Sequence, residues 1–115
     1  MQLEIADDHD ENLADMAEKL FGTRPTVARE HHIKPGIQFV YNYENGYGAS
    51  VVRFPGSYGH EKKLWELAVL EYNPKKDCWD LTYDTPITDD VEGYLTERDI
   101  TKALKRIENM MIEVL

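Results

Sequence analysis

Hydrophobic side chains recur every three or four positions in residues 10–21, the spacing of a helix with one buried face. These positions are Leu13, Met16, Ala17, Leu20 and Phe21. Asp8 or Asp10 can cap the start of this helix, because a carboxylate accepts hydrogen bonds from the first free backbone N–H groups. Gly22 and Pro25 follow the pattern, which predicts that the helix ends at residue 21.

A second helical pattern begins after Thr96 near the C-terminus. Thr96 can act as the N-cap. Three residues later, the Asp99 side chain can accept a hydrogen bond from the Thr96 backbone N–H, as in a capping box. One apolar stripe then follows in steps of four and three residues: Ile100, Leu104, Ile107, Met111 and Val114. It spans only about two heptads, which favours a helix packed on a sheet over a coiled coil.

Between the helices, large and small or polar side chains alternate, as they do in half-buried strands. The predicted strands are residues 37–43, 47–54, 64–72 and 78–83, the last carrying Trp79, Leu81 and Tyr83. Asn45 and Gly46 predict a hairpin with a type I′ turn, in which both central residues have positive φ. Residues 26–33 fit either a short extra strand or a loop.

These elements predict an α+β fold, in which an antiparallel meander of three to four strands is covered by an N-terminal and a C-terminal helix. The apolar strand side chains are expected to form the sheet face under the helices. The chain has 115 residues, so we expect residues 1–115 to form a single domain.

The net charge of −9 argues against direct binding to nucleic acid or to an anionic membrane surface. No run of about 18 apolar residues predicts a membrane span. The N-terminus is acidic where a signal peptide is basic, and the single cysteine cannot form an internal disulfide. We therefore expect a cytoplasmic protein.

The residues that could carry chemistry match no established catalytic or metal-binding spacing. His9, His31, His32 and His60 fit no metal motif and are interpreted as exposed, partly solvated imidazoles. Cys78 lies in a predicted strand, which favours burial over reactivity. No catalytic residue, metal ligand or cofactor is assigned, although an enzyme stays among the alternatives.

The negative charge is concentrated in two blocks. Residues 1–21 hold seven acids and one base, and residues 84–99 hold six acids and one base. One explanation is that carboxylates favour helix N-termini. The other is that both blocks form one surface that presents carboxylates, in place of phosphates, to a basic partner. That surface would include Asp7, Asp8, Asp10, Glu11, Asp84, Asp89, Asp90 and Glu92, with the aromatic residues Tyr47 and Tyr58.

Part of the chain resembles small proteins encoded by phages and prophages. The resemblance covers roughly residues 38–108 and is carried by NGYGASVV at 45–52, SYG at 57–59, LWELAVL at 64–70 and YDTPITDDVEGYLT at 83–96. Proteins of this kind are mostly uncharacterised, so the resemblance transfers no catalytic or binding residue to this chain. The resemblance implies an accessory phage protein acting in the cytoplasm of a bacterial host.

The leading hypothesis is a non-enzymatic phage accessory protein that binds a basic host or phage protein, for example as an acidic inhibitor of a nucleic-acid-binding factor. One alternative is a small enzyme or nucleotide-binding protein with its site in the loop at residues 83–94. Another is a structural or self-associating protein, such as a homodimer formed through the C-terminal stripe or an open sheet edge.

Overall fold

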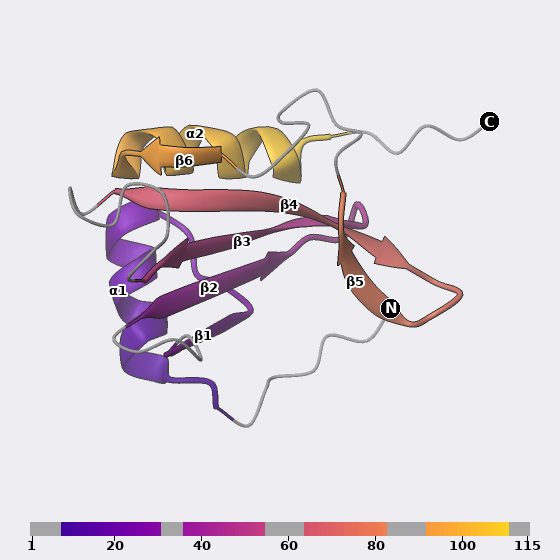
Figure 1. Ribbon diagram of the computed structural model, residues 1–115, viewed down its shortest axis with the longest axis horizontal. Helices are drawn as coiled ribbons and strands as arrows, with labels where there is room; N and C mark the ends of the chain where they lie inside the picture. The colour runs from indigo at the N-terminus through magenta and orange to yellow at the C-terminus, as the bar shows by residue number, and fades with distance from the viewer. Residues whose placement is uncertain (1–7, 31–35, 55–63, 83–91, 111–115) are drawn as a thin grey trace.

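The computed structural model describes residues 8–30, 36–54, 64–82 and 92–110 (Figure 1). Its elements follow in the order α1 (Glu11–Phe21), β1 (Val27–Glu30), β2 (Ile37–Asn42), β3 (Tyr47–Arg53), β4 (Trp65–Asn73), β5 (Cys78–Leu81), β6 (Glu92–Leu95) and α2 (Glu97–Glu108). The predicted α+β class, with a helix at each end and antiparallel strands between them, is confirmed.

The sheet is an antiparallel meander in the order β1-β2-β3-β4-β5, and β6 pairs with β4 beside this path. The predicted count of three to four strands is therefore wrong. The undecided segment at residues 26–33 contains the strand β1. β6 was missed because its four residues include an acid and a glycine, which are rare in strands. Its pairing with Trp65 and Leu67 of β4 is a tertiary contact that the local pattern does not signal.

Both helices pack on one face of the sheet, with α1 across the strands and α2 along β4 (Figure 1). The buried cluster joins the inner faces of the helices to alternate strand residues: Ala14, Ala17, Phe21, Ala28, Phe39, Tyr41, Ala49, Val51, Trp65, Leu67, Val69, Ile100, Leu104 and Ile107. Met111 and Val114 of the predicted stripe lie outside the described residues. The expected arrangement of helices over one apolar sheet face is confirmed.

β5 does not extend this core as expected. Trp79 pairs with Tyr72, and Leu81 pairs with Leu70, so both side chains lie on the sheet face away from the helices. The Trp79 ring packs against Tyr72 with centroids 5.5 Å apart, and Leu81 is 50% exposed. The alternation in this segment correctly predicted a strand. The expectation that Trp79 and Leu81 face the helices is wrong. Tyr83 lies outside the described residues.

The helix ends follow from the capping residues. Asp10 is the N-cap of α1, and its carboxylate accepts from the N–H groups of Asn12 and Leu13 at 2.8 and 3.2 Å. Gly22 ends the helix with φ 79°, a left-handed conformation that glycine adopts without strain. At α2, Thr96 and Asp99 form the predicted capping box.

The β2–β3 hairpin is confirmed, but its predicted turn type is wrong. Among residues 43–47, all of which the structure describes, only Gly46 has a positive φ, of 87°. Tyr43 N–H donates to Tyr47 O at 2.9 Å, and Gly46 N–H donates to Tyr43 O at 3.1 Å. This is a three-residue loop in which a type I turn precedes a left-handed glycine.

Asn45 connects this turn to the end of α2. Its side-chain amide donates to the carbonyl oxygens of Ile107 and Met110 at 2.8 and 2.9 Å. Its carbonyl oxygen accepts from Tyr47 N–H at 3.0 Å. These contacts add side-chain hydrogen bonds to carbonyl groups at and just beyond the end of α2, and they position the turn next to α2.

We expect Gly46→Val to lower the free energy of unfolding by about 1 kcal/mol or more, because a β-branched residue is strained at positive φ. Urea denaturation measures the loss. Glu44→Val is the matched control, since Glu44 lies in the same turn without a positive φ. An unchanged stability for Gly46→Val would contradict the turn geometry.

Candidate functional site

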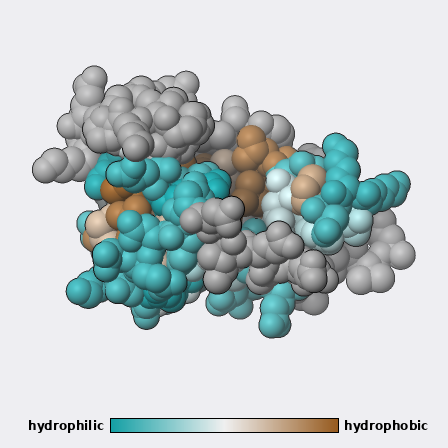
Figure 2. Space-filling view, turned by 90° about the horizontal axis from the view of Figure 1, so that it is seen from below, coloured by the Kyte–Doolittle hydropathy of each residue, from teal (hydrophilic) through white to brown (hydrophobic). Residues whose placement is uncertain are grey.

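The outward face of α1 carries an acidic stripe. Glu11, Asp15 and Glu18 are spaced by four and three residues and therefore lie on one side of the helix. Their side chains are 70%, 60% and 53% exposed. We call these three residues the α1 acidic face. On the left of Figure 2, where Figure 1 places α1 and β1, the described surface is mostly hydrophilic.

All three carboxylates of the α1 acidic face contact one arginine. Gly22 turns the chain back after α1, and Arg24 donates to Asp15 at 2.6 Å, to Glu18 at 3.2 Å and to Glu11. The hydrogen bond to Asp15 is the main cause of the raised pKa of Arg24; desolvation opposes it, and the bonds to Glu18 and Glu11 add to it. One guanidinium balances one of three negative charges, so the face stays acidic.

In the first acidic block, the described site residues Asp8, Asp10 and Glu11 all have partners within the chain. Asp8 pairs with Arg29 at 3.4 Å, and Asp10 caps α1. Glu11 belongs to the α1 acidic face. The N-cap role of Asp10 favours the explanation that some of these acids serve the helix start. Asp15 and Glu18 were not predicted as site residues, although their helical spacing from Glu11 is visible in the sequence.

Of the other predicted site residues, the structure describes only Tyr47 and Glu92, and neither belongs to α1. Asp7, Tyr58, Asp84, Asp89 and Asp90 lie outside the described residues. Glu92 lies in β6, and Tyr47 begins β3 beside the β2–β3 turn. Tyr47 lines a separate cavity of about 270 Å³. A single surface formed by both acidic blocks stays a prediction.

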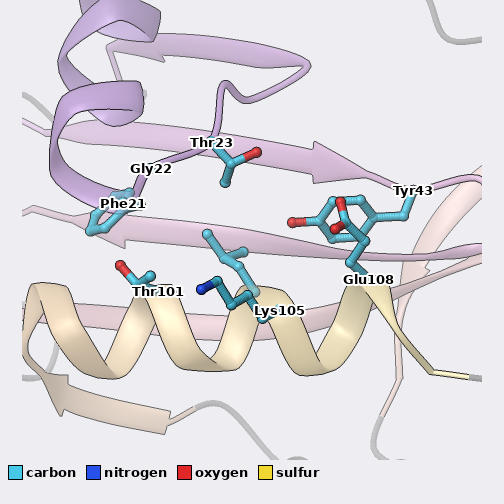
Figure 3. Close-up of a pocket in the computed structure, with 8 residues that line it drawn as sticks. Phe21, Gly22, Thr23, Tyr43, Thr101, Lys105 and Glu108 are labelled. Atoms are coloured by element: carbon cyan, nitrogen blue, oxygen red, sulfur yellow. The ribbon is translucent and has the colours of Figure 1, made fainter.

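A cleft of about 320 Å³ opens between the C-terminal end of α1 and the side of α2 (Figure 3). It is lined by Phe21, Gly22, Thr23, Tyr43, Thr101, Leu104, Lys105 and Glu108. This volume is at the lower end of the range for small-ligand pockets. The lining comes from three distant segments, so no sequence pattern could have indicated it.

Five of the side chains that line the cleft have hydrogen-bonding or charged ends: Thr23, Tyr43, Thr101, Lys105 and Glu108. The Tyr43 hydroxyl points into it, and Lys105 and Glu108 extend from α2 one turn apart (Figure 3). Burial, followed by the charge of Glu108, raises the pKa of Tyr43 well above its usual value. The hydroxyl therefore stays protonated and can donate a hydrogen bond. Within the described ranges, no residue forms an ion pair with Lys105 or Glu108.

His9 is a structural residue, and its expected exposure is wrong. Only 9% of its side chain is exposed. Ala28 N–H donates to Nδ1 at 2.9 Å, so the ring proton lies on Nε2, which is 3.0 Å from a Glu11 oxygen. Asp10 N–H also donates to Ala28 O at 2.6 Å. These bonds cover part of the outer edge of β1, which would otherwise be open to pairing. His31, His32 and His60 lie outside the described residues.

Cys78 is half-buried rather than fully buried. Partial desolvation is the main cause of its raised pKa, and the contact with Asp80 at 3.6 Å adds to it. Both effects disfavour the reactive thiolate. In the described parts of the chain, no three His, Cys, Asp or Glu side chains are grouped closely enough to hold a metal ion.

No family model, curated protein or solved structure matches this chain. Neither helix in the described residues is long and apolar enough to cross a bilayer.

Proposed function

We propose that this chain is a non-enzymatic phage or prophage accessory protein that binds a basic host or phage protein through the α1 acidic face. The observation that carries the proposal is the set of three exposed carboxylates on one helix face that share Arg24. The phage setting comes from the sequence resemblance alone. A cytoplasmic location is proposed on the same basis.

Charge is the expected basis of recognition. Exposed carboxylates attract basic side chains over about one Debye length, about 8 Å at physiological salt, and so accelerate encounter more than they stabilise the complex. Surface ion pairs within one chain contribute little to stability. The contacts of Arg24 can therefore be exchanged for contacts with a basic partner at small cost. A protein that normally binds phosphates has suitable Lys and Arg side chains.

The test begins with affinity capture of the partner from phage-infected bacterial lysate. The variant Glu11→Gln/Asp15→Asn/Glu18→Gln should then slow association about tenfold at low salt, because steering by charge is lost. The control Glu71→Gln/Asp77→Asn/Asp80→Asn removes three acids from the β4–β5 hairpin, which lies at the other end of the molecule from α1 (Figure 1).

Association rates should be measured by surface plasmon resonance at two salt concentrations. The wild-type rate should fall with salt, and the variant rate should change little. Equal rates for the wild type and the α1 variant, or equal slowing by the hairpin control, would contradict recognition through the α1 acidic face. Unfolding curves for both variants establish that the fold is retained.

A further inference from the structure

We infer that the cleft between α1 and α2 receives an arginine side chain of the basic partner. This inference rests on the proposed function, because it names the side chain by which that partner is anchored. The cleft begins where the α1 acidic face ends: Gly22, which lines the cleft, donates its N–H to the carbonyl oxygen of Glu18 at 2.9 Å. A basic segment lying along α1 therefore reaches the cleft one helical turn beyond Glu18.

The walls suit a flat, cationic group. The Tyr43 ring lies at one side with the Glu108 side chain next to it (Figure 3). Phe21 and Leu104 line the cleft from the buried core, where each is 2% exposed. A guanidinium is planar, stacks on aromatic rings and pairs with carboxylates. Glu108 offers the carboxylate, and a volume of about 320 Å³ leaves room for the whole side chain.

The end of α1 adds negative potential. The last carbonyl groups of a helix carry a partial negative charge and accept hydrogen bonds from cations. A Cβ placed on Gly22 would meet no atom within 4 Å, so the backbone here is open to a ligand. Thr101 donates its own hydroxyl to Glu97 O at 2.9 Å, which leaves its oxygen as an acceptor.

Lys105 is the opposing feature, because its ammonium group lies on the same cleft and repels a cation. Because Lys105 and Glu108 have opposite charges, removing each charge in turn reveals whether the ligand is a cation or an anion. For a cationic ligand, removing the charge of Lys105 strengthens binding and removing the charge of Glu108 weakens it. For an anionic ligand both effects reverse.

The probe is N-acetyl-arginine amide, titrated into the ¹⁵N-labelled protein at millimolar concentrations and followed by NMR. Saturable shifts are expected at the amides of Thr23, Thr101 and Leu104. Glu108→Gln should weaken binding and Lys105→Gln should strengthen it, each about three- to fivefold, as for a partly exposed charge pair. Asp80→Asn, a charge removal on the distant β5, should leave the affinity unchanged.

Absence of saturable shifts at the cleft would overturn the inference. Preferential binding of N-acetyl-glutamate amide, with the variant effects reversed, would overturn it as well. The two proposals fail separately. If the arginine probe does not bind but the α1 variant still slows the partner, only the cleft assignment is wrong. If the probe binds and the α1 variant has no effect, only recognition through the α1 acidic face is wrong.

Discussion

Trp65→Ala should lower the free energy of unfolding by about 3–5 kcal/mol, the range for removing a large buried aromatic side chain. Trp65 is 1% exposed and lies at the centre of the core. Its ring centroid is 5.4 Å from that of Phe21 and 5.5 Å from that of Phe39. The guanidinium carbon of Arg53 lies 4.2 Å from the ring centroid. The substitution therefore removes contacts among α1, β2 and β3 at once.

Trp79→Ala provides the matched control for this prediction. Trp79 is half-buried on β5 and packs against Tyr72 on the other face of the sheet. Its loss should cost less than that of Trp65, because the side chain is only half-buried; the aromatic pair with Tyr72 contributes about 1 kcal/mol of the loss. Urea denaturation followed by circular dichroism measures both variants. Equal losses at the two tryptophans would contradict the placement of Trp65 in the core.

Leu104→Ala should cost about 2–5 kcal/mol, because its side chain is 2% exposed and lies in the middle of the buried stripe of α2. The removed methyl groups leave a cavity between α2 and the sheet. Lys102→Ala, on the exposed side of the same helix, should change stability by less than about 0.5 kcal/mol. A loss below about 0.5 kcal/mol at Leu104 would mean that α2 does not cover the sheet.

The parts of the fold that were predicted correctly have local causes. Asp10 and Gly22 delimit α1, and Thr96 with Asp99 begins α2, because capping depends on neighbouring backbone groups. Strands with strong alternation were placed within one or two residues of their observed ends. Gly46 predicted the hairpin, although its exact turn type depended on the backbone of Asn45.

The errors concern contacts between segments that are distant in sequence. β6 forms because β4 offers an unpaired edge, and its own residues give a weak signal. Leu81 is apolar yet exposed because its register with Leu70 directs it away from the helices. His9 is buried because its ring lies against β1, where Nδ1 accepts a hydrogen bond from the Ala28 N–H. The periodicity of apolar residues along the chain does not show which distant segments pair or form hydrogen bonds with one another.

The candidate site was predicted only in part for the same reason. The sequence located negative charge near the start of α1, but it could not show that Arg24 gathers Glu11, Asp15 and Glu18. The helical spacing of those acids is visible in the sequence, but their shared contact with Arg24 is not. The cleft forms where Tyr43 lies next to the end of α2. This proximity depends on how the helices pack on the sheet, which the sequence pattern does not show.

The most direct test of partner recognition is an NMR footprint of the captured partner on the ¹⁵N-labelled protein. Amide signals of residues 11–24 and 101–108 should shift or broaden on complex formation, because these residues form the α1 acidic face and the cleft. Signals of residues 73–81 in the β4–β5 hairpin should stay unchanged. Perturbation of the hairpin alone, with α1 unaffected, would contradict it.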